Sequence, residues 1–299
     1  MKLHKIAAAL ALSALALGSQ AVPLIASFNA ATSGGFIFPT ATCAASGVNG
    51  TTTTPDSQAN CQASLNFTGL NGVVPTAFPA NTPGFIQTAL AGFPFGLGGL
   101  PTYNSVAWGT AATANGQSSL DVTHLAAANG PVITDGGWVV IDKFQHHNNL
   151  ITPEGGFMNS VAFYGQFDLA ANLPFAGLAV PGINSIGLNE TLNVGPCAPP
   201  NPNGSTCDDL FVTQPLEGTF QFYTDGNGTP YFIQFRFDNG SGGVVIPDGG
   251  NVDIYTAEGV TSFVTTSVRI FTVPEPGMLA LFGFGLVGVA LSRRRKVSV

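Results

Sequence analysis

Alternation of apolar and polar side chains is the main pattern in the body of the chain, and it is clearest near residue 235. Tyr231, Ile233, Phe235 and Phe237 occupy every second position, and Gln234, Arg236 and Asp238 alternate with them. A period of two predicts a strand with one buried face. The preceding Asp225-Gly226-Asn227-Gly228 favours a tight turn, because glycine and asparagine tolerate positive φ. The sequence therefore predicts a β-hairpin over residues 219–238.

Shorter candidate strands, most of them with the same alternation, recur between turns rich in glycine, proline and asparagine. They cover residues 120–124, 138–141, 161–169, 252–254 and 264–270. The body lacks a sustained period of 3.6 residues, which an amphipathic helix requires. The pattern therefore predicts an all-β fold, an antiparallel β-sandwich that occupies residues 105–272.

Residues 22–104 have a different pattern, rich in alanine, threonine, glycine and proline. Apolar pieces are short there, as at 36–38 and 85–86, and breakers separate them. We therefore expect a loop-rich N-terminal part with a few short strands before the β-sandwich domain.

The first 21 residues have the three-part pattern of a secretory signal peptide. Lys2 and Lys5 precede an apolar run over residues 6–17, and small residues occupy the −3 and −1 positions of a cleavage site. Twelve apolar residues are too few to span a bilayer comfortably. The pattern predicts export through the Sec translocon and cleavage between Ala21 and Val22. An uncleaved anchor or a buried core helix is the alternative.

The end of the chain, residues 273–299, is a second composite signal. An uncharged apolar run over residues 278–291 is followed by a basic cluster, which stays on the cytoplasmic side of a membrane. The two prolines before the run keep the adjacent chain extended. The pattern predicts a single short transmembrane helix with the body outside. The residues that define the signal are Val273, Pro274, Glu275, Pro276, Gly277, Arg293, Arg294 and Arg295.

This tail resembles the PEP-CTERM sorting domain, a family found in Gram-negative bacteria that make exopolysaccharide. The resemblance covers residue 273 to about residue 296 and rests on three features in order. It implies recognition by an exosortase, a membrane cysteine transpeptidase that cuts near the Pro-Glu-Pro motif. The implied route is a transient stay in the inner membrane, followed by the cell surface or the extracellular matrix. An ordinary tail anchor with a chance Pro-Glu-Pro is the alternative.

The charge of the body excludes nucleic acid as a partner. Six of the nine basic residues lie in the two terminal signals, so the body carries three basic residues against fifteen acidic ones, a formal charge of −12. Such a surface repels phosphate backbones. It is compatible with an extracellular solute.

The four cysteines form two local pairs in segments rich in turn-forming residues. Cys43 and Cys61 are 18 residues apart, and Cys197 and Cys207 are 10 apart. Because an exported chain enters an oxidising compartment, the simplest prediction is two nearest-neighbour disulfides, although three pairings are possible. Neither pair has the Cys-x-x-Cys spacing of a zinc site.

Three segments in the middle of the chain, 108–109, 117–120 and 144–151, carry a second resemblance. This part of the chain is similar to the THxN family of PEP-CTERM proteins and to the related choice-anchor K domain. In that family a Trp-Gly strand and a Ser-rich strand precede a Thr-His-x-Asn motif. Here His146 and Asn148 match the histidine and asparagine, while Gln145 replaces the threonine. The resemblance implies export and surrounding strands but no established activity.

His146 and Asn148 also allow several chemical interpretations. An imidazole can bind a metal or act as a base, but an imidazole and an amide also fix a loop by hydrogen bonds, which we expect here. The Gly-rich turns at Asp225 and Asp248 offer oxygen ligands that suit Ca²⁺, yet neither has a complete calcium loop. We therefore predict plain turns, no metal site and no cofactor.

No catalytic constellation is evident in the sequence. It has neither a G-x-S-x-G elbow nor a G-x-x-x-x-G-K-[ST] loop. We therefore expect a cell-surface or matrix protein without catalytic activity, next to the exopolysaccharide of a biofilm. One alternative is a carbohydrate-binding or adhesive module, with Trp108 and Trp138 stacking on sugar rings. The other is a secreted hydrolase in which His146 meets an aspartate and a serine.

Overall fold

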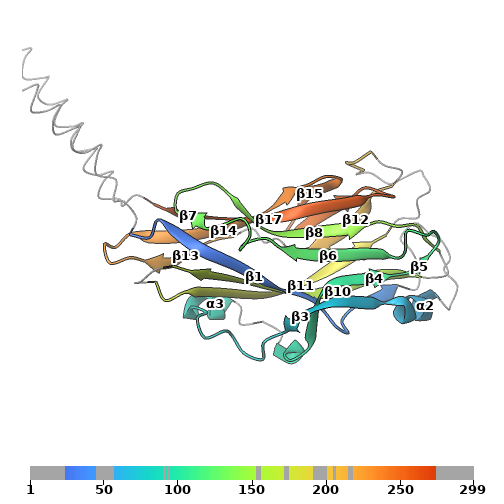
Figure 1. Cartoon of the computed structure of the whole chain (residues 1–299), viewed down its shortest axis with the longest axis horizontal. Helices are drawn as coiled ribbons and strands as arrows, with labels where there is room; N and C mark the ends of the chain where they lie inside the picture. Colours follow the sequence, from blue (N-terminus) through green and yellow to red (C-terminus); the bar gives the residue numbers. More distant parts are fainter. Residues whose placement is uncertain are drawn as a thin grey trace, which may run out of the picture.

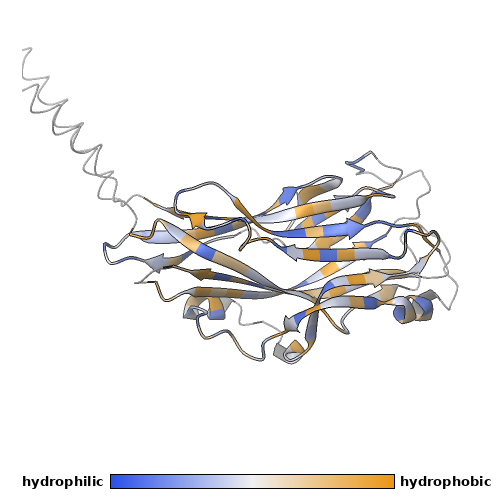
Figure 2. Ribbon diagram, viewed as in Figure 1, coloured by the Kyte–Doolittle hydropathy of each residue, from blue (hydrophilic) through white to orange (hydrophobic). Residues whose placement is uncertain are grey.

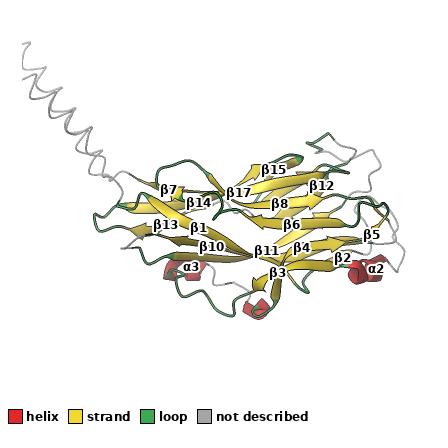
Figure 3. Cartoon of the chain, in the orientation of Figure 1, coloured by secondary structure: helices red, strands yellow, loops and turns green. Residues whose placement is uncertain are grey.

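The computed structural model is dominated by antiparallel strands, which confirms the predicted all-β fold (Figure 3). The signal peptide ending at Ala21 and the sorting segment from Pro274 onward lie outside the residues that the structure describes. The described residues are 24–44, 57–89, 92, 95–152, 156–171, 175–190, 201–204, 207–214 and 218–273.

Seventeen strands and three short helices are present in the described part of the chain. The helices are α2 (Ser57–Ser64), α3 (Gly84–Ala89) and the 3₁₀ helix η1 (Phe95–Leu97). The strands are β1 (Ser27–Ile37), β2 (Thr42–Ala44), β3 (Asn66–Val73), β4 (Pro101–Trp108), β5 (Thr110–Ala111), β6 (Ser118–His124), β7 (Val132–Ile133), β8 (Val139–His147), β9 (Ile151–Thr152), β10 (Phe157–Ala170), β11 (Leu178–Asn189), β12 (Asp209–Thr213), β13 (Gly218–Thr224), β14 (Pro230–Asn239), β15 (Gly243–Asp248), β16 (Asn251–Thr256) and β17 (Thr261–Thr272).

Fifteen of these strands form one continuous sheet rather than the two separate sheets of the expected sandwich. Its main order is β13-β14-β17-β8-β6-β4-β1-β10-β11-β12-β16-β15, with β2, β3 and β7 attached at the side. The sheet curls so that one half faces the other (Figure 1). At one end a bridge between Gly242 and Phe263 brings the β14–β15 connection beside β17. Large antiparallel sheets twist and curl in this way, because curling covers their apolar face.

The N-terminal part contributes a central strand to this sheet. β1 pairs with β10 from Asn29 to Phe36, and its end pairs with β4. Its inward positions include Ala30, Thr32 and Gly34. These small side chains remove the apolar alternation that marks strands elsewhere, so the sequence predicted only loops and a few short strands in this part.

The inward-facing side chains form two apolar cores, and apolar residues alternate with polar ones along most strands (Figure 2). Burial of each large side chain contributes about 1.5–3 kcal/mol to folding. The first core includes Phe36, Trp108, Leu120, Val161, Phe163, Ile186, Phe211, Ile254 and Val264. The second core includes Phe28, Ile141, Phe167, Leu169, Leu178, Phe222, Tyr231, Ile233, Val268 and Ile270.

One predicted disulfide is confirmed. Cys43 of β2 is bonded to Cys61 of α2, with the two Cα atoms 6.0 Å apart. A bond that closes an 18-residue loop contributes about 3 kcal/mol in the chain-entropy account. Cys207 is disulfide-bonded as well, and its expected partner, Cys197, lies outside the described residues.

The described part of the chain contains no helix that is long and apolar enough to cross a membrane. The predicted transmembrane segment, residues 278–291, belongs to the part that the structure does not describe.

Candidate functional site

A cavity of about 350 Å³ lies inside the curled sheet, between the first and the second core. Its floor is formed where β10 and β11 pair, with Gly165 directly opposite Gly182. Both glycines fall at inward positions of their strands, since Phe163 and Phe167 on either side of Gly165 belong to the two cores. The cores are thus separated because two neighbouring inward positions carry no side chain.

Phenylalanine rings form much of the cavity wall. Phe144 meets Phe163 edge-on at 5.1 Å between ring centroids, and Phe167 meets Phe235 edge-on at 5.2 Å. Edge-to-face contacts of this kind add to the energy of area burial. The seven phenylalanines of the wall are Phe144, Phe163, Phe167, Phe211, Phe220, Phe235 and Phe237.

Within the described part of the chain, two polar side chains of the cavity wall have an atom without a hydrogen-bond partner. They are His146 of β8, through Nε2, and Thr266 of β17, through Oγ1, and both side chains are about 1% exposed. The other ring nitrogen of His146, Nδ1, is 2.9 Å from Thr256 Oγ1. Burial, together with the neighbouring His147, lowers the pKa of His146 to about 3. The imidazole is therefore neutral near pH 7.

The segment that resembles the Thr-His-x-Asn motif connects several strands. The His146 ring stacks on Trp108 of β4 at 5.7 Å and meets Phe211 of β12 edge-on at 4.8 Å. Asn148 is buried, and its Nδ2 donates to Asp209 Oδ2 at 2.7 Å. Both residues therefore contact other strands at the end of β8, where the sequence analysis expects them to organise a loop.

Trp108 continues this buried cluster. Its Nε1 donates to Glu190 Oε2 at 2.5 Å. Burial raises the pKa of Glu190 well above its usual range, and the charge of Asp209 adds to the effect, while the Trp108 hydrogen bond opposes it. The next residue, Gly109, has φ +78°, and a Cβ there would lie 2.6 Å from an Ile151 methyl carbon. Trp108 thus supplies a buried hydrogen bond to Glu190, and Ile151 leaves no space for a side chain at position 109.

The Ser-rich segment joins the same region. Ser118 Oγ donates to the Asn149 carbonyl at 2.8 Å, and Asn149 Nδ2 donates to the Gln117 carbonyl at 2.8 Å. The structure therefore brings together the three segments on which the second resemblance rests. The sequence indicated Asp208 and Asp209 only as a candidate accessory site for calcium, and it did not indicate Glu190, which precedes a turn-rich segment.

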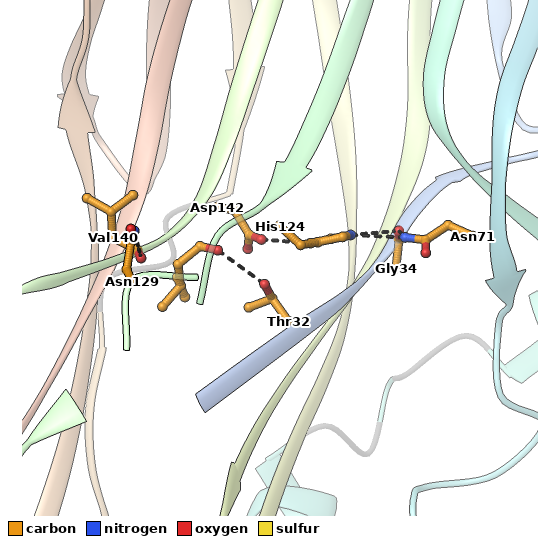
Figure 4. A network of polar contacts seen from close by, with 8 residues as sticks. Thr32, Gly34, Asn71, His124, Asn129, Val140 and Asp142 are labelled. Carbon is orange, nitrogen blue, oxygen red and sulfur yellow. Dashed lines mark hydrogen bonds and ion pairs between the residues drawn. The ribbon is translucent and has the colours of Figure 1, made fainter. Parts of the chain in front are cut away.

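A second polar network lies on the other side of the cavity, around His124 at the end of β6 (Figure 4). Its Nδ1 donates to Asp142 Oδ1 at 2.8 Å, and its Nε2 donates to the Gly34 carbonyl at 3.2 Å. Asn71 Nδ2 donates to the same carbonyl. Burial alone lowers the pKa of His124, but the hydrogen bond and charge of Asp142, with the Gly34 carbonyl, raise it above 6.5.

The structure bears on the two alternative functions considered above. Trp108 is fully buried, so its ring cannot stack on a sugar. Trp138 is half-buried, and the guanidinium groups of Arg236 and Arg269 lie 4.2 and 4.8 Å from its ring. His146 contacts a threonine hydroxyl rather than the aspartate and serine of a hydrolase.

The Gly-rich turn at Asp225 is organised by its own hydrogen bonds. Asp225 Oδ1 accepts from the backbone N–H groups of Asn227 and Thr229, and Oδ2 accepts from the Tyr231 hydroxyl. Its carboxylate thus acts as a turn residue, and the β13–β14 hairpin is confirmed. Among the described residues, no group of three or more His, Cys, Asp or Glu side chains is placed to hold a metal ion.

The last strand of the fold leads directly into the sorting segment. Asp135, at φ 58°, accepts two hydrogen bonds from Thr272 of β17, from its N–H at 2.7 Å and from its hydroxyl at 2.8 Å. Val273 follows with 45% of its side chain exposed. The fold therefore ends at a fixed point and presents the next residue to solvent. The remaining residues of the predicted motif, and the Ala21–Val22 cleavage site, lie outside the described residues.

Comparison with known families identifies this segment. Residues 272–296 match the PEP-CTERM protein-sorting motif. The match confirms the predicted PEP-CTERM tail and supports an exported protein that is sorted to the cell surface with an exosortase as its processing partner. No curated protein matches the chain.

Proposed function

We propose that this chain is an exported cell-surface or extracellular-matrix protein, processed at its PEP-CTERM tail and associated with exopolysaccharide in a biofilm. One observation carries the proposal: the matched motif begins at Thr272, the last residue of β17. A processing enzyme can therefore reach the tail without unfolding the body. Other proteins commonly bind peptide segments in an extended conformation.

The body is proposed to have no catalytic activity. The histidine that sequence analysis singled out, His146, stacks on Trp108 and bonds to Thr256. A pKa of about 3 makes it a poor base near neutral pH, because efficient general bases titrate close to the working pH. The stacking of His146 on Trp108 and the hydrogen bond from Asn148 to Asp209 support a body of the THxN or choice-anchor K type.

The proposed route has three steps. The signal peptide directs the chain to the Sec translocon, and the apolar run over residues 278–291 holds it briefly in the inner membrane of a Gram-negative cell. The basic cluster at residues 293–296 keeps the C-terminus on the cytoplasmic side. Cleavage near Pro-Glu-Pro then frees the body from the transmembrane helix.

Replacing Pro274, Glu275 and Pro276 together by alanine tests this route in a host that has an exosortase. The expected result is a longer precursor in the membrane fraction, because the enzyme no longer recognises the segment. Immunoblots of membrane and extracellular fractions measure it. The matched control is Asn227→Ala, a change at an exposed turn residue far from the tail in sequence. An extracellular product of normal size from the triple variant would refute processing at this motif.

A further inference from the structure

The glycine floor of the cavity provides space that a ligand can fill. A Cβ built on Gly182 would meet no other heavy atom within 4 Å. At Gly165 it would meet only the ring of Phe163. Protein interiors normally fill such space, because voids forfeit dispersion contacts. A volume of about 350 Å³ lies within the range of small-molecule sites.

Several phenylalanine side chains of the cavity wall are not fully buried by contacts within the protein. Phe144, Phe220, Phe235 and Phe237 line the cavity, yet each is only half-buried. Inward-facing rings of a core are usually buried completely, as Phe28 and Phe36 are. An apolar molecule between these rings would remove their remaining surface from water, which is favourable by about 25 cal/mol per Å².

The charges around the cavity select against an anion. None of the described residues that line it is a lysine or an arginine, and its single carboxylate is Asp142, which His124 holds at 2.8 Å. A carboxylate or phosphate ligand would lose its hydration without gaining a partner. The ligand should therefore be neutral.

The two polar atoms without hydrogen-bond partners indicate where a polar group of the ligand would lie. Buried polar groups are usually hydrogen-bonded, so His146 Nε2 and Thr266 Oγ1 are exceptions that require an explanation. Their side chains stand on neighbouring strands, β8 and β17, and both line the cavity. A single hydroxyl group could satisfy either of them, since a hydroxyl donates and accepts.

Access is open on one side of the curled sheet. The cavity is lined by Gly182 and Asn184 of β11 and by Phe220 of β13. β13 is an edge strand of the sheet, and β11 pairs with β10 and β12 instead. The wall between β11 and β13 is thus not sealed by backbone hydrogen bonds among the described strands.

From these observations we infer that the cavity binds a neutral, apolar small molecule that carries one hydroxyl group. The phenylalanine wall holds the apolar part over the Gly165–Gly182 floor. Thr266 receives the hydroxyl, because His146 lies four residues away along the β8–β17 pair, too far for the same group to reach. The site is independent of the tail, so this inference stands or falls separately from exosortase processing.

Three naphthalene compounds test the inference with the purified full chain, by displacement of the neutral fluorescent probe N-phenyl-1-naphthylamine. They share one ring skeleton: 2-naphthol has a hydroxyl, naphthalene has none, and 2-naphthoate is an anion. We expect 2-naphthol to bind about 3- to 10-fold more tightly than naphthalene, the usual range for one net hydrogen bond. The anion should bind at least tenfold more weakly than 2-naphthol. Equal affinity for 2-naphthol and 2-naphthoate would overturn the inference.

Two variants locate the binding. Gly182→Leu fills the floor and should weaken 2-naphthol binding at least tenfold, whereas the matched control Gly218→Leu, at an exposed β13 position with the same free space, should not. Both carry the same tail, so any binding by the tail cancels. Unchanged affinity in Gly182→Leu would refute the site.

Thr266→Val provides a test that does not depend on cavity filling. Valine has nearly the shape of threonine, and the lost hydroxyl has no partner in the described structure, so folding should be preserved. The preference for 2-naphthol over naphthalene should fall at least threefold. If the preference is unchanged in Thr266→Val, the assignment of the hydroxyl to this wall is wrong, and this test still applies if Gly182→Leu fails to fold.

Discussion

His124 and His146 lie on neighbouring strands of one sheet face, yet their surroundings shift their pKa values in opposite directions. At His124, Nδ1 lies 2.8 Å from Asp142 Oδ1, and Nε2 lies 3.2 Å from the Gly34 carbonyl oxygen and 3.0 Å from Asn71 Nδ2. At His146 the one partner is a hydroxyl, and aromatic rings cover the rest. A carboxylate within hydrogen-bond distance thus raises the pKa of a largely buried imidazole against the opposing effect of burial.

The comparison also separates a completed network from an incomplete one. The His124 network ties β6 to β8, β1 and the Asn71 segment, and it has no spare polar atom on the histidine. His146 organises the end of β8 but keeps Nε2 unused. The first arrangement is typical of a structural network, and the second leaves a polar group that a ligand can use.

The largest expected effect is on the free energy of unfolding when the imidazole ring of His146 or of His124 is removed. His146→Ala should lower the free energy of unfolding by about 3 kcal/mol, because it leaves a void beside Trp108 and removes the Thr256 bond. His124→Ala should cost about 1 kcal/mol, since its network is partly exposed to water. Urea unfolding of the purified chain measures both. Equal losses would show that the two sites do not differ in burial.

The next effect is a pH dependence that belongs to His146. Its pKa is lowered from 6.5 to about 3, so the unfolded chain binds more protons than the folded chain between these values. Stability should therefore fall as pH decreases from 6.5, with a slope of up to about 1.4 kcal/mol per pH unit.

The control for this slope is His146→Gln, which cannot titrate and leaves Glu190 in place. The difference in unfolding free energy between wild type and variant should shrink between pH 6.5 and pH 5. A difference that does not depend on pH in this window would mean that His146 is not buried as neutral imidazole.

The smallest effect should come from His124 and has the opposite sign. Because its pKa is raised in the folded state, its contribution is fully present below pH 6.5 and is lost as pH rises through the folded pKa. We expect a loss of at most about 1 kcal/mol. In Asp142→Asn the pKa of His124 should fall below that of the wild type, as followed by NMR of the imidazole protons. An unchanged titration would exclude Asp142 as the cause.

The sequence predicted those parts of the fold that depend on neighbouring residues. The hairpin over residues 219–238 and the Cys43–Cys61 bond follow from local alternation and local spacing, and both are confirmed. The PEP-CTERM tail was predictable for the same reason, since a peptide signal is recognised without a fold.

The parts of the fold that the sequence did not predict depend on contacts between residues far apart in the chain. β1 was expected to lie in loops because its inward positions at Ala30, Thr32 and Gly34 are small, and only pairing with β10 makes it a strand. The cavity could not be predicted, because it arises where Gly165 is placed opposite Gly182 by the register of two strands. A glycine that interrupts an apolar alternation was the available signal.

The most direct test of the account is the mass of the protein recovered from the outside of the producing cells. Mass spectrometry should find a chain that begins at Val22 and ends near Pro274, Glu275 and Pro276, with the Arg293–Arg295 cluster removed. An intact chain inside the cytoplasm, with Lys2 still attached, would contradict export and sorting through the tail.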